Sequence, residues 1–285
     1  MQFNTPLRYP GGKGRLSQCV ADIMETNGLT GGHYIEPYAG GSAVALSLLM
    51  LEYASHVHIN DLNRSVHAFW SAVLNDTDRL CARIRSERVS MAHWHRQRAV
   101  QQDPDADTLD LAYSTFFLNR TNRSGIIMGG VIGGKGQDGP WKLNARFNKA
   151  NLIHRIERIA ALRHSISLHR RDASDLITQL LPTLPKRSLV YLDPPYYVKG
   201  KGLYEDHYGH DDHKAIAQQV ATIQQHWIVS YDNVPEIRKM YQAYRYRTFG
   251  LRYSAQNRYE GAEVMFFSKQ LRLPAEIVPS RAEAA

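Results

Sequence analysis

The chain has 285 residues, with 35 Lys and Arg against 27 Asp and Glu, which gives a formal net charge of +8. The length suffices for one large or two modest domains, and with 43% hydrophobic and 22% charged residues the composition excludes wholesale disorder. The excess of positive charge favours a polyanionic partner.

Neither export nor membrane insertion is indicated by the sequence. Residues 1–10 contain no apolar run of the signal-peptide type, and the longest apolar stretch, near 43–51, is far shorter than the roughly 20 residues of a membrane span. The two cysteines, Cys19 and Cys81, are too far apart for the paired-thiol spacing of zinc or redox sites. We therefore expect a cytoplasmic protein with no metal and no membrane contact.

The first half predicts a βαβ unit. Strand-type runs at 33–36 and 56–60 flank a helix-type segment at 42–53, and the glycine pair 40–41 lies between the first strand and the helix. Glycines at a helix N-terminus let a nucleotide approach the backbone, and Asp61, about 20 residues later, lies where Rossmann-like folds bind ribose hydroxyls. The pattern predicts an adenosine-containing ligand. A tight turn with a capping Asp61 is the alternative, and NAD is disfavoured because the spacing is not GxGxxG.

The middle of the chain, 63–164, differs in character. It predicts three or four helices, followed at 121–140 by a stretch rich in glycine and basic residues with almost no helix signal. A loop of that length inside a compact domain is usually functional or disordered. The helical aromatic residues of this region are expected in the core; they are Phe69, Trp70, Phe116 and Phe117.

The second half returns to alternating strands and helices. Strands are predicted at 165–168, 188–192, 227–231 and 262–268, and helices at 173–181 and 211–225, whereas residues 271–285 are expected to be a loose tail. The whole pattern predicts an α/β sheet with an insertion between its two halves.

The segment Asp193-Pro194-Pro195-Tyr196 follows the apolar run 189–192 directly. An acid at the carboxyl end of such a strand faces the crevice in which open α/β sheets bind ligands. The prolines stiffen the turn and leave carbonyls that no sheet uses. A carboxylate, a carbonyl and an aromatic ring can together accept the hydrogens of an amino group and stack on its base, which is the chemistry that a flipped nucleobase needs. An ordinary turn is the alternative.

These motifs together resemble the Dam-type DNA adenine N6-methyltransferase family, which uses S-adenosylmethionine. Residues 8–13 (RYPGGK) are similar to its N-terminal cofactor motif, 36–44 to its glycine motif and 60–63 to its ribose-binding acid, and 193–196 to its catalytic motif. One departure is Ser42, which stands where the family usually has a glycine. The resemblance covers nearly the whole chain up to the tail.

The resemblance implies a Rossmann-like methyltransferase sheet with an inserted, mostly helical target-recognition domain. The catalytic domain would comprise 1–61 and 165–270, and the inserted domain 62–164. The implied catalytic residues are Asp193, Pro194, Pro195 and Tyr196, with the Tyr196 ring rather than its hydroxyl holding the adenine. The implied cofactor-binding residues are Tyr9, Lys13, Glu36, Tyr38, Gly40, Asp61, Asp172 and Asp193.

Residues 117–126 resemble the start of the family's DNA-reading hairpin. Arg and Asn pair with guanine and adenine edges and lysines mostly contact phosphates, so we expect base contacts from Asn122 and Arg123 and backbone contacts from the basic residues beyond them. A solvated basic loop is the alternative, and Arg120 has a second interpretation as an anchor of the hairpin. The expected DNA-binding residues are Arg120, Asn122, Arg123, Lys135, Lys142, Arg146 and Arg258.

The predicted function is site-specific transfer of a methyl group from S-adenosylmethionine to N6 of a flipped adenine in double-stranded DNA. Methylation of cytosine N4, methylation of adenine in RNA and non-catalytic DNA binding are the alternatives. The expected form is a monomer, and a restriction-modification role with a cognate endonuclease is left open. The family members that read GATC carry an arginine that 127–129 lacks, so the recognition sequence is not predicted.

Overall fold

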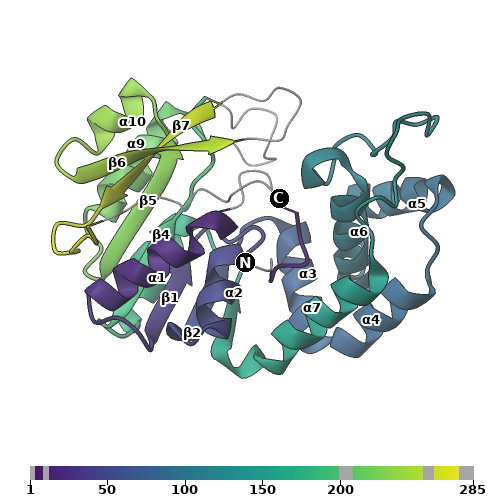
Figure 1. Ribbon diagram of the computed structural model, residues 1–285, viewed down its shortest axis with the longest axis horizontal. Helices are drawn as coiled ribbons and strands as arrows, with labels where there is room; N and C mark the ends of the chain where they lie inside the picture. The colour runs from purple at the N-terminus through teal and green to yellow at the C-terminus, as the bar shows by residue number, and fades with distance from the viewer. Residues whose placement is uncertain (1–3, 9–12, 199–207, 253–259, 276–285) are drawn as a thin grey trace. The chain divides into compact units, whose positions relative to one another are not determined.

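The computed structural model describes residues 4–8, 13–198, 208–252 and 260–275. The chain divides into two compact units (Figure 1). The helical unit groups Met1–Gly12 with Leu62–His164, and the sheet unit groups Lys13–Asp61 with Ser165–Ala285. The predicted assignment of residues 1–61 to one domain therefore differs from this grouping over the first twelve residues.

The sheet unit is built on a mixed sheet that has, within the described residues, seven strands in the order β3-β2-β1-β4-β5-β7-β6. Strands β1 to β5 pair in parallel, and β7 runs antiparallel between β5 and β6. The strands are β1 (Gly32–Glu36), β2 (Ala54–Asn60), β3 (Ile166–His169), β4 (Ser188–Leu192), β5 (His226–Asp232), β6 (Arg245–Arg252) and β7 (Glu260–Phe267). The predicted α/β class is confirmed, and β6 is the strand that the sequence pattern did not predict.

The helices of the sheet unit complete a core whose buried residues come from the central strands and from α9, among them Val190, Val220 and Tyr231. The helical elements are η1 (Gly14–Leu16), α1 (Ser17–Thr26), α2 (Ala43–Met50), α8 (Ala173–Asp175), η4 (Leu176–Leu180), η5 (Leu181–Thr183), α9 (His210–Val220) and α10 (Pro235–Met240). Because the strands β1, β2, β4 and β5 are parallel, the loops after them meet at one edge of the sheet, where α/β folds bind ligands.

The helical unit contains five α-helices in its described residues, one more than the upper expectation. They are α3 (Arg64–Asn75), α4 (Thr77–Ser86), α5 (Met91–Gln102), α6 (Thr108–Thr121) and α7 (Lys149–Ala161). The predicted aromatic core is confirmed: Phe69, Trp70, Phe116 and Phe117 are fully buried, and the rings of Phe69 and Phe116 stack 6.0 Å apart. After α6, the short helix η2 (Arg123–Gly125) and an antiparallel bridge between Asn122 and Val131 form a hairpin.

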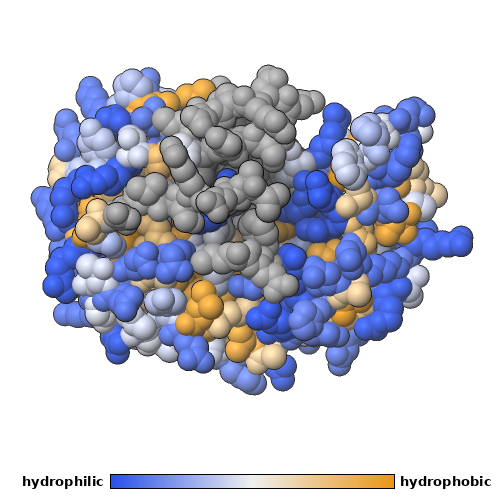
Figure 2. Space-filling model, in the orientation of Figure 1, coloured by the Kyte–Doolittle hydropathy of each residue, from blue (hydrophilic) through white to orange (hydrophobic). Residues whose placement is uncertain are grey.

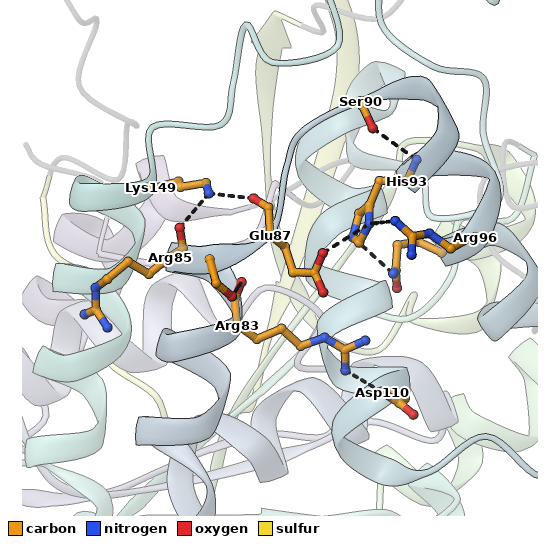
Figure 3. A network of polar contacts seen from close by, with 10 residues as sticks. Arg83, Arg85, Glu87, Ser90, His93, Arg96, Asp110 and Lys149 are labelled. Carbon is orange, nitrogen blue, oxygen red and sulfur yellow. Dashed lines mark hydrogen bonds and ion pairs between the residues drawn. The ribbon is translucent and has the colours of Figure 1, made fainter.

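A polar network fixes α5 against its neighbours in the helical unit (Figure 3). The buried His93 ring lies 3.4 Å from Glu87 and hydrogen-bonds Gln97 and Arg96, and Lys149 of α7 donates to the Glu87 carbonyl. The inward-facing side chains of His93 and Gln97 are therefore held by hydrogen bonds.

The N-terminal segment packs into the helical unit. The Asn119 side chain of α6 exchanges two hydrogen bonds with the backbone of Arg8, each 2.7 Å, and also donates to the Gly125 carbonyl. Gly125 has φ +77°, and a Cβ there would meet the Arg8 carbonyl oxygen at 1.9 Å. Only glycine allows this close passage of the two backbones.

The end of the described chain is partly ordered, in contrast to the expected loose tail. Leu271 is fully buried, and the Arg272 amide donates to Asn27 at 2.7 Å. No helix among the described residues is long and apolar enough to cross a membrane. Hydrophilic residues cover most of the face drawn in colour in Figure 2.

Candidate functional site

The segment 193–196 begins at the carboxyl end of β4, as expected. Asp193 Oδ1 accepts a 2.6 Å hydrogen bond from the Ser230 hydroxyl and lies 3.3 Å from Lys13 Nζ. Ser230 is itself 2.9 Å from the Tyr191 hydroxyl. Within the described residues no donor bonds Asp193 Oδ2, and the side chain is 23% exposed. One carboxylate oxygen is thus anchored, and the other accepts no hydrogen bond from the described residues.

Lys13 is a buried cation that joins the catalytic motif to β7. Its ammonium lies 3.1 Å from Glu263 Oε2 and 2.7 Å from the Tyr196 hydroxyl. Burial raises the pKa of Glu263, and the nearby Lys13 charge opposes that rise. Lys13 is thereby held by two carboxylates and a phenol, all from the sheet unit.

Tyr196 differs from its expectation in one respect. Its hydroxyl donates to Glu263 and receives a hydrogen bond from Lys13, and the residue is 3% exposed. The sequence predicted no role for the hydroxyl, which belongs to a buried network. Stacking of the ring on a base stays a prediction.

The chain after Tyr196 is held by Asp232 at the end of β5. Its two carboxylate oxygens accept from the backbone amides of Tyr197 and Val198, at 2.9 and 3.0 Å. A single side chain from the neighbouring strand thus fixes where the catalytic turn ends.

The glycine loop is fastened to the end of β2. The Gly40 amide donates to Asp61 Oδ2 at 2.9 Å, and the buried Asn60 side chain bonds the Pro37 carbonyl and both backbone groups of Arg171. Asn60 therefore holds the loops after β1 and β3 in place beside Asp61.

Glu36, at the end of β1, is buried at 4% exposure. Its Oε1 accepts from the Tyr34 hydroxyl and the Ala45 amide, whereas Oε2 is buried without a hydrogen-bond partner. Burial raises the pKa of the Glu36 carboxyl to about 8. A buried oxygen of this kind is able to receive a donor from a ligand.

Two further expected cofactor residues are described. Asp172 caps α8 by accepting from the Ser174 amide at 2.8 Å, and the Tyr38 hydroxyl lies 3.1 Å from that of Tyr208. Tyr9 lies outside the described residues.

In the hairpin of the helical unit, Asn122 is a structural residue. It is fully buried, its Oδ1 accepts from Trp94 Nε1 at 2.7 Å, and its Nδ2 donates to the carbonyls of Ile126 and Ile127. Because the hairpin and Trp94 of α5 use every side-chain group of Asn122, the structure contradicts the expected base contact. Arg120 likewise binds the carbonyls of Arg146 and Pro6, as the alternative interpretation of an anchor predicted.

Arg123 and Lys135 lie at a cavity of about 540 Å³ between α5 and the hairpin. Two residues that the sequence analysis did not select, His95 and Arg98, add to its basic lining, and none of its lining residues is acidic. The Arg98 guanidinium lies over Trp94 at 5.2 Å and donates to the carbonyls of Met128 and Gly129. The hairpin tip is thereby tied to α5.

Lys142 and Arg146 lie farther along the same loop and are exposed. Lys142 donates to the Gln137 carbonyl, and the Arg146 guanidinium lies 6.0 Å from the ring of Trp141, which is 67% exposed. Arg258 lies outside the described residues.

The comparisons with known proteins decide the family. Residues 9–255 match the model of the D12 class N6 adenine-specific DNA methyltransferases. The chain belongs to this family. The reaction of a D12 methyltransferase is methylation of adenine N6 in DNA, with S-adenosylmethionine as the cofactor, and the predicted resemblance, activity and cofactor are thus confirmed.

One curated relative is the type II methyltransferase M.MjaIII of Methanocaldococcus jannaschii, which is 26% identical over 213 residues, or 69% of this chain and 70% of the relative. Among solved structures, a candidate RNA methyltransferase from Pyrococcus horikoshii covers 92% of this chain and 85% of its own, at 10% identity and a TM-score of 0.44. A candidate class I S-adenosylmethionine-dependent methyltransferase from Listeria monocytogenes covers 98% of this chain and 66% of its own, at 10% identity and a TM-score of 0.41. These scores add nothing to the family assignment.

The residues of the D12 sheet unit fit the cofactor. S-adenosylmethionine carries an ammonium and a sulfonium charge, and the buried Glu36 Oε2 offers an acceptor to a cationic group. Asp61 ends β2 beside the glycine loop, the position from which Rossmann-like folds bind a ribose. Glu36, Gly40 and Asp61 are thus the described residues best placed to hold it.

Sequence reasoning missed Glu263, Ser230 and Asp232. A signal existed for Glu263, because a lone acid inside the apolar run 262–267 has to be buried with a partner. Ser230 and Asp232 also lie in an apolar strand, but the sequence does not predict that β5 lies beside β4, which is what brings both residues to the segment after β4. That adjacency is a product of the sheet topology.

Proposed function

We propose that this D12 methyltransferase uses Asp193 as the group that binds and orients the adenine amino group. The observation that carries the proposal is the divided use of its carboxylate: Lys13 and Ser230 hold Oδ1, and no donor of the described residues reaches Oδ2. Because a charge and a hydroxyl hold Oδ1, the carboxylate is fixed in position, and its Oδ2 is preorganised to accept an N6–H hydrogen bond.

Adenine N6 is a poor nucleophile because its lone pair is delocalised into the ring. Hydrogen bonds from the amino group to Asp193 and to the Pro194 carbonyl favour the pyramidal form of N6, and the carboxylate stabilises the positive charge that develops on N6. When bound, S-adenosylmethionine would supply an activated methyl group to N6, and the proton that N6 gives up would pass to solvent. Tyr196 and Pro195 complete the wall that positions the base.

The proposed substrate is an adenine rotated out of double-stranded DNA. N6 lies inside a duplex and cannot reach a carboxylate at a sheet edge unless the nucleotide leaves the stack. We further propose that residues 62–164 form the inserted target-recognition domain and that 1–61 and 165–270 carry the catalysis.

The DNA-contacting face that we propose is the basic lining of the cavity between α5 and the hairpin. Arg123 would read a base edge, Lys135 and Arg98 would neutralise phosphates, and His95 would hydrogen-bond the DNA backbone. The exposed loop beyond it would add backbone contacts through Lys142 and Arg146, and its exposed Trp141 offers an aromatic surface to a base or sugar.

The proposed active form is a monomer, in which one chain supplies both Lys13 and Ser230 to Asp193. The type II relative supports pairing with a restriction endonuclease that cuts the same sequence. DNA as the substrate implies that the protein works in the compartment that holds the genome.

Single-molecule sequencing of DNA from cells that express the chain tests the proposal. We expect N6-methyladenine at one sequence motif with the wild type and none with Asp193→Asn, which keeps the size of the side chain and removes its charge. Modified cytosine, or full methylation by the variant, would contradict the assigned chemistry.

A further inference from the structure

Ser42, the residue directly before α2, combines two unfavourable features. Its backbone is left-handed, with φ 48° and ψ 33°, a conformation that costs a non-glycine residue about 1–2 kcal/mol. The residue is 1% exposed, and its hydroxyl has no hydrogen-bond partner. Four described non-glycine residues have positive φ, namely Ser42, Glu52, Ser124 and Gln137, and among them Ser42 alone is buried.

Helix capping does not explain this serine. A serine before a helix normally accepts from the amide three residues on, yet Ser42 makes no side-chain cap. The Ala45 amide that it would cap donates instead to Glu36 Oε1 at 3.0 Å. The fold therefore uses neither the hydroxyl nor the Cβ of Ser42, and a glycine would satisfy the backbone with less strain.

Ser42 also lies beside the groups proposed to hold the cofactor. The Ser42 amide closes the glycine loop on the Ala39 carbonyl, and the Gly40 amide of the same loop is bonded to Asp61. Glu36, whose Oε2 is also buried without a partner, contacts the first turn of the helix that Ser42 precedes. Strained residues and unpaired buried groups that occur together are typical of a ligand site.

We infer that the Ser42 hydroxyl is a cofactor-binding group that hydrogen-bonds the amino-acid end of S-adenosylmethionine. This inference rests on the proposed cofactor site. The α-carboxylate of the ligand requires donors, and a hydroxyl can donate to it, whereas Glu36 accepts from the ammonium. Ser42 thus keeps a strained backbone and supplies a hydroxyl contact that a glycine cannot make.

The test compares Ser42→Gly with Ser42→Ala by thermal unfolding without ligand and by calorimetric titration. S-adenosylhomocysteine carries the amino-acid end, and 5′-methylthioadenosine lacks it. We expect Ser42→Gly to raise Tm by about 2–4 °C, because the strain and the unpaired hydroxyl disappear. We expect Ser42→Ala, which keeps the strain, to show less of that rise.

Both variants should bind S-adenosylhomocysteine about tenfold more weakly than wild type and 5′-methylthioadenosine within twofold of wild type. Unchanged S-adenosylhomocysteine affinity in Ser42→Gly would overturn the inference, and so would equal losses for the two ligands, which would indicate a reshaped loop. A wild-type protein that binds neither ligand would instead refute the proposed cofactor site, and the inference with it.

Discussion

Lys13 Nζ lies 3.3 Å from Asp193 Oδ1, although Lys13 comes from before the first helix and Asp193 from the end of β4. The same ammonium is 3.1 Å from Glu263 of β7. One buried cation therefore serves the proposed catalytic carboxylate and a structural carboxylate together. Its removal should affect stability and turnover by separate routes.

Lys13→Met should lower the free energy of unfolding by about 3–5 kcal/mol, because it leaves buried carboxylates without their counter-charge. The double variant Lys13→Met/Glu263→Met removes the charge on each side and should recover most of that stability. Turnover should stay low in the double variant, because Asp193 still lacks the Lys13 charge and keeps only the Ser230 hydrogen bond. Denaturant unfolding and a tritiated-methyl assay measure the two effects, and a fully stable single variant would contradict the interpretation.

Tyr196→Phe should be damaging, since the hydroxyl bonds Lys13 and Glu263 in a buried network. Leaving these partners unsatisfied costs about 1–3 kcal/mol, and turnover should fall with the altered position of Lys13. The adjacent Tyr197→Phe is the matched control, because the Tyr197 hydroxyl bonds the exposed His210 instead. If the two variants retain equal stability and turnover, the network has no role.

Cofactor binding should depend on the protonation of Glu36. Its pKa is raised to about 8, above the ordinary value of 4.5, so the carboxyl is neutral at pH 7. Because the unfolded chain loses this proton at a lower pH than the folded protein, the free energy of unfolding decreases as the pH rises from 4.5 through 8. A cationic ligand group favours the carboxylate, so binding should release a proton and affinity for S-adenosylhomocysteine should increase between pH 6 and 8. Titrations at pH 7 in buffers of different ionisation enthalpy measure that proton. Glu36→Gln should abolish the release, and a release that persists would remove Glu36 from the binding site.

Acid should destabilise the sheet unit through a line of histidines on β1, β2 and β3. His58 lies 3.1 Å from His33 and 3.3 Å from His169, and burial lowers its pKa to about 3. A histidine whose pKa is lower in the folded protein than in the unfolded chain stabilises the folded state at pH values above about 6.5, the pKa in the unfolded chain. That stability is lost as the pH falls toward 3, by about 1.4 kcal/mol per pH unit.

His58→Leu should therefore show a flatter dependence of unfolding free energy on pH between 6 and 4 than wild type. His154→Leu replaces an exposed histidine of α7 and serves as the control. Denaturant melts across this range compare the slopes. Equal slopes for wild type and His58→Leu would show that His58 does not titrate on unfolding.

The hairpin variants should separate structure from recognition. Asn122→Ala should cost about 1–3 kcal/mol of stability, because Trp94 and two carbonyls lose their partner. Arg123→Ala should leave Tm unchanged and relax preference at one base pair by about 1–3 kcal/mol, and Lys135→Ala should weaken all sequences alike and reduce the salt slope by about 1. Binding to single-substituted duplexes at several salt concentrations is the measurement. Parallel losses for Arg123→Ala and Lys135→Ala would remove Arg123 from the reading residues.

Local pattern was enough to predict much of the molecule. Six strands of the sheet, the aromatic core of the helical unit and the family motifs at 36–44 and 193–196 are readable because periodicity and motif spacing are properties of neighbouring residues. Strand β6 escaped prediction because its interleaved basic and aromatic residues, 245–252, carry little apolar alternation.

The tertiary structure alone decided which distant residues surround those motifs. Glu263 and Ser230 reach the catalytic motif only because β5 lies beside β4 and β7 beside β5. Asn122 was predicted to contact a base because asparagine side chains pair with adenine. In the structure it is buried and bonded to Trp94, so its side chain stabilises the hairpin instead. Residue type states what a side chain is able to bind, whereas burial and partners, which depend on long-range packing, decide what remains free to bind.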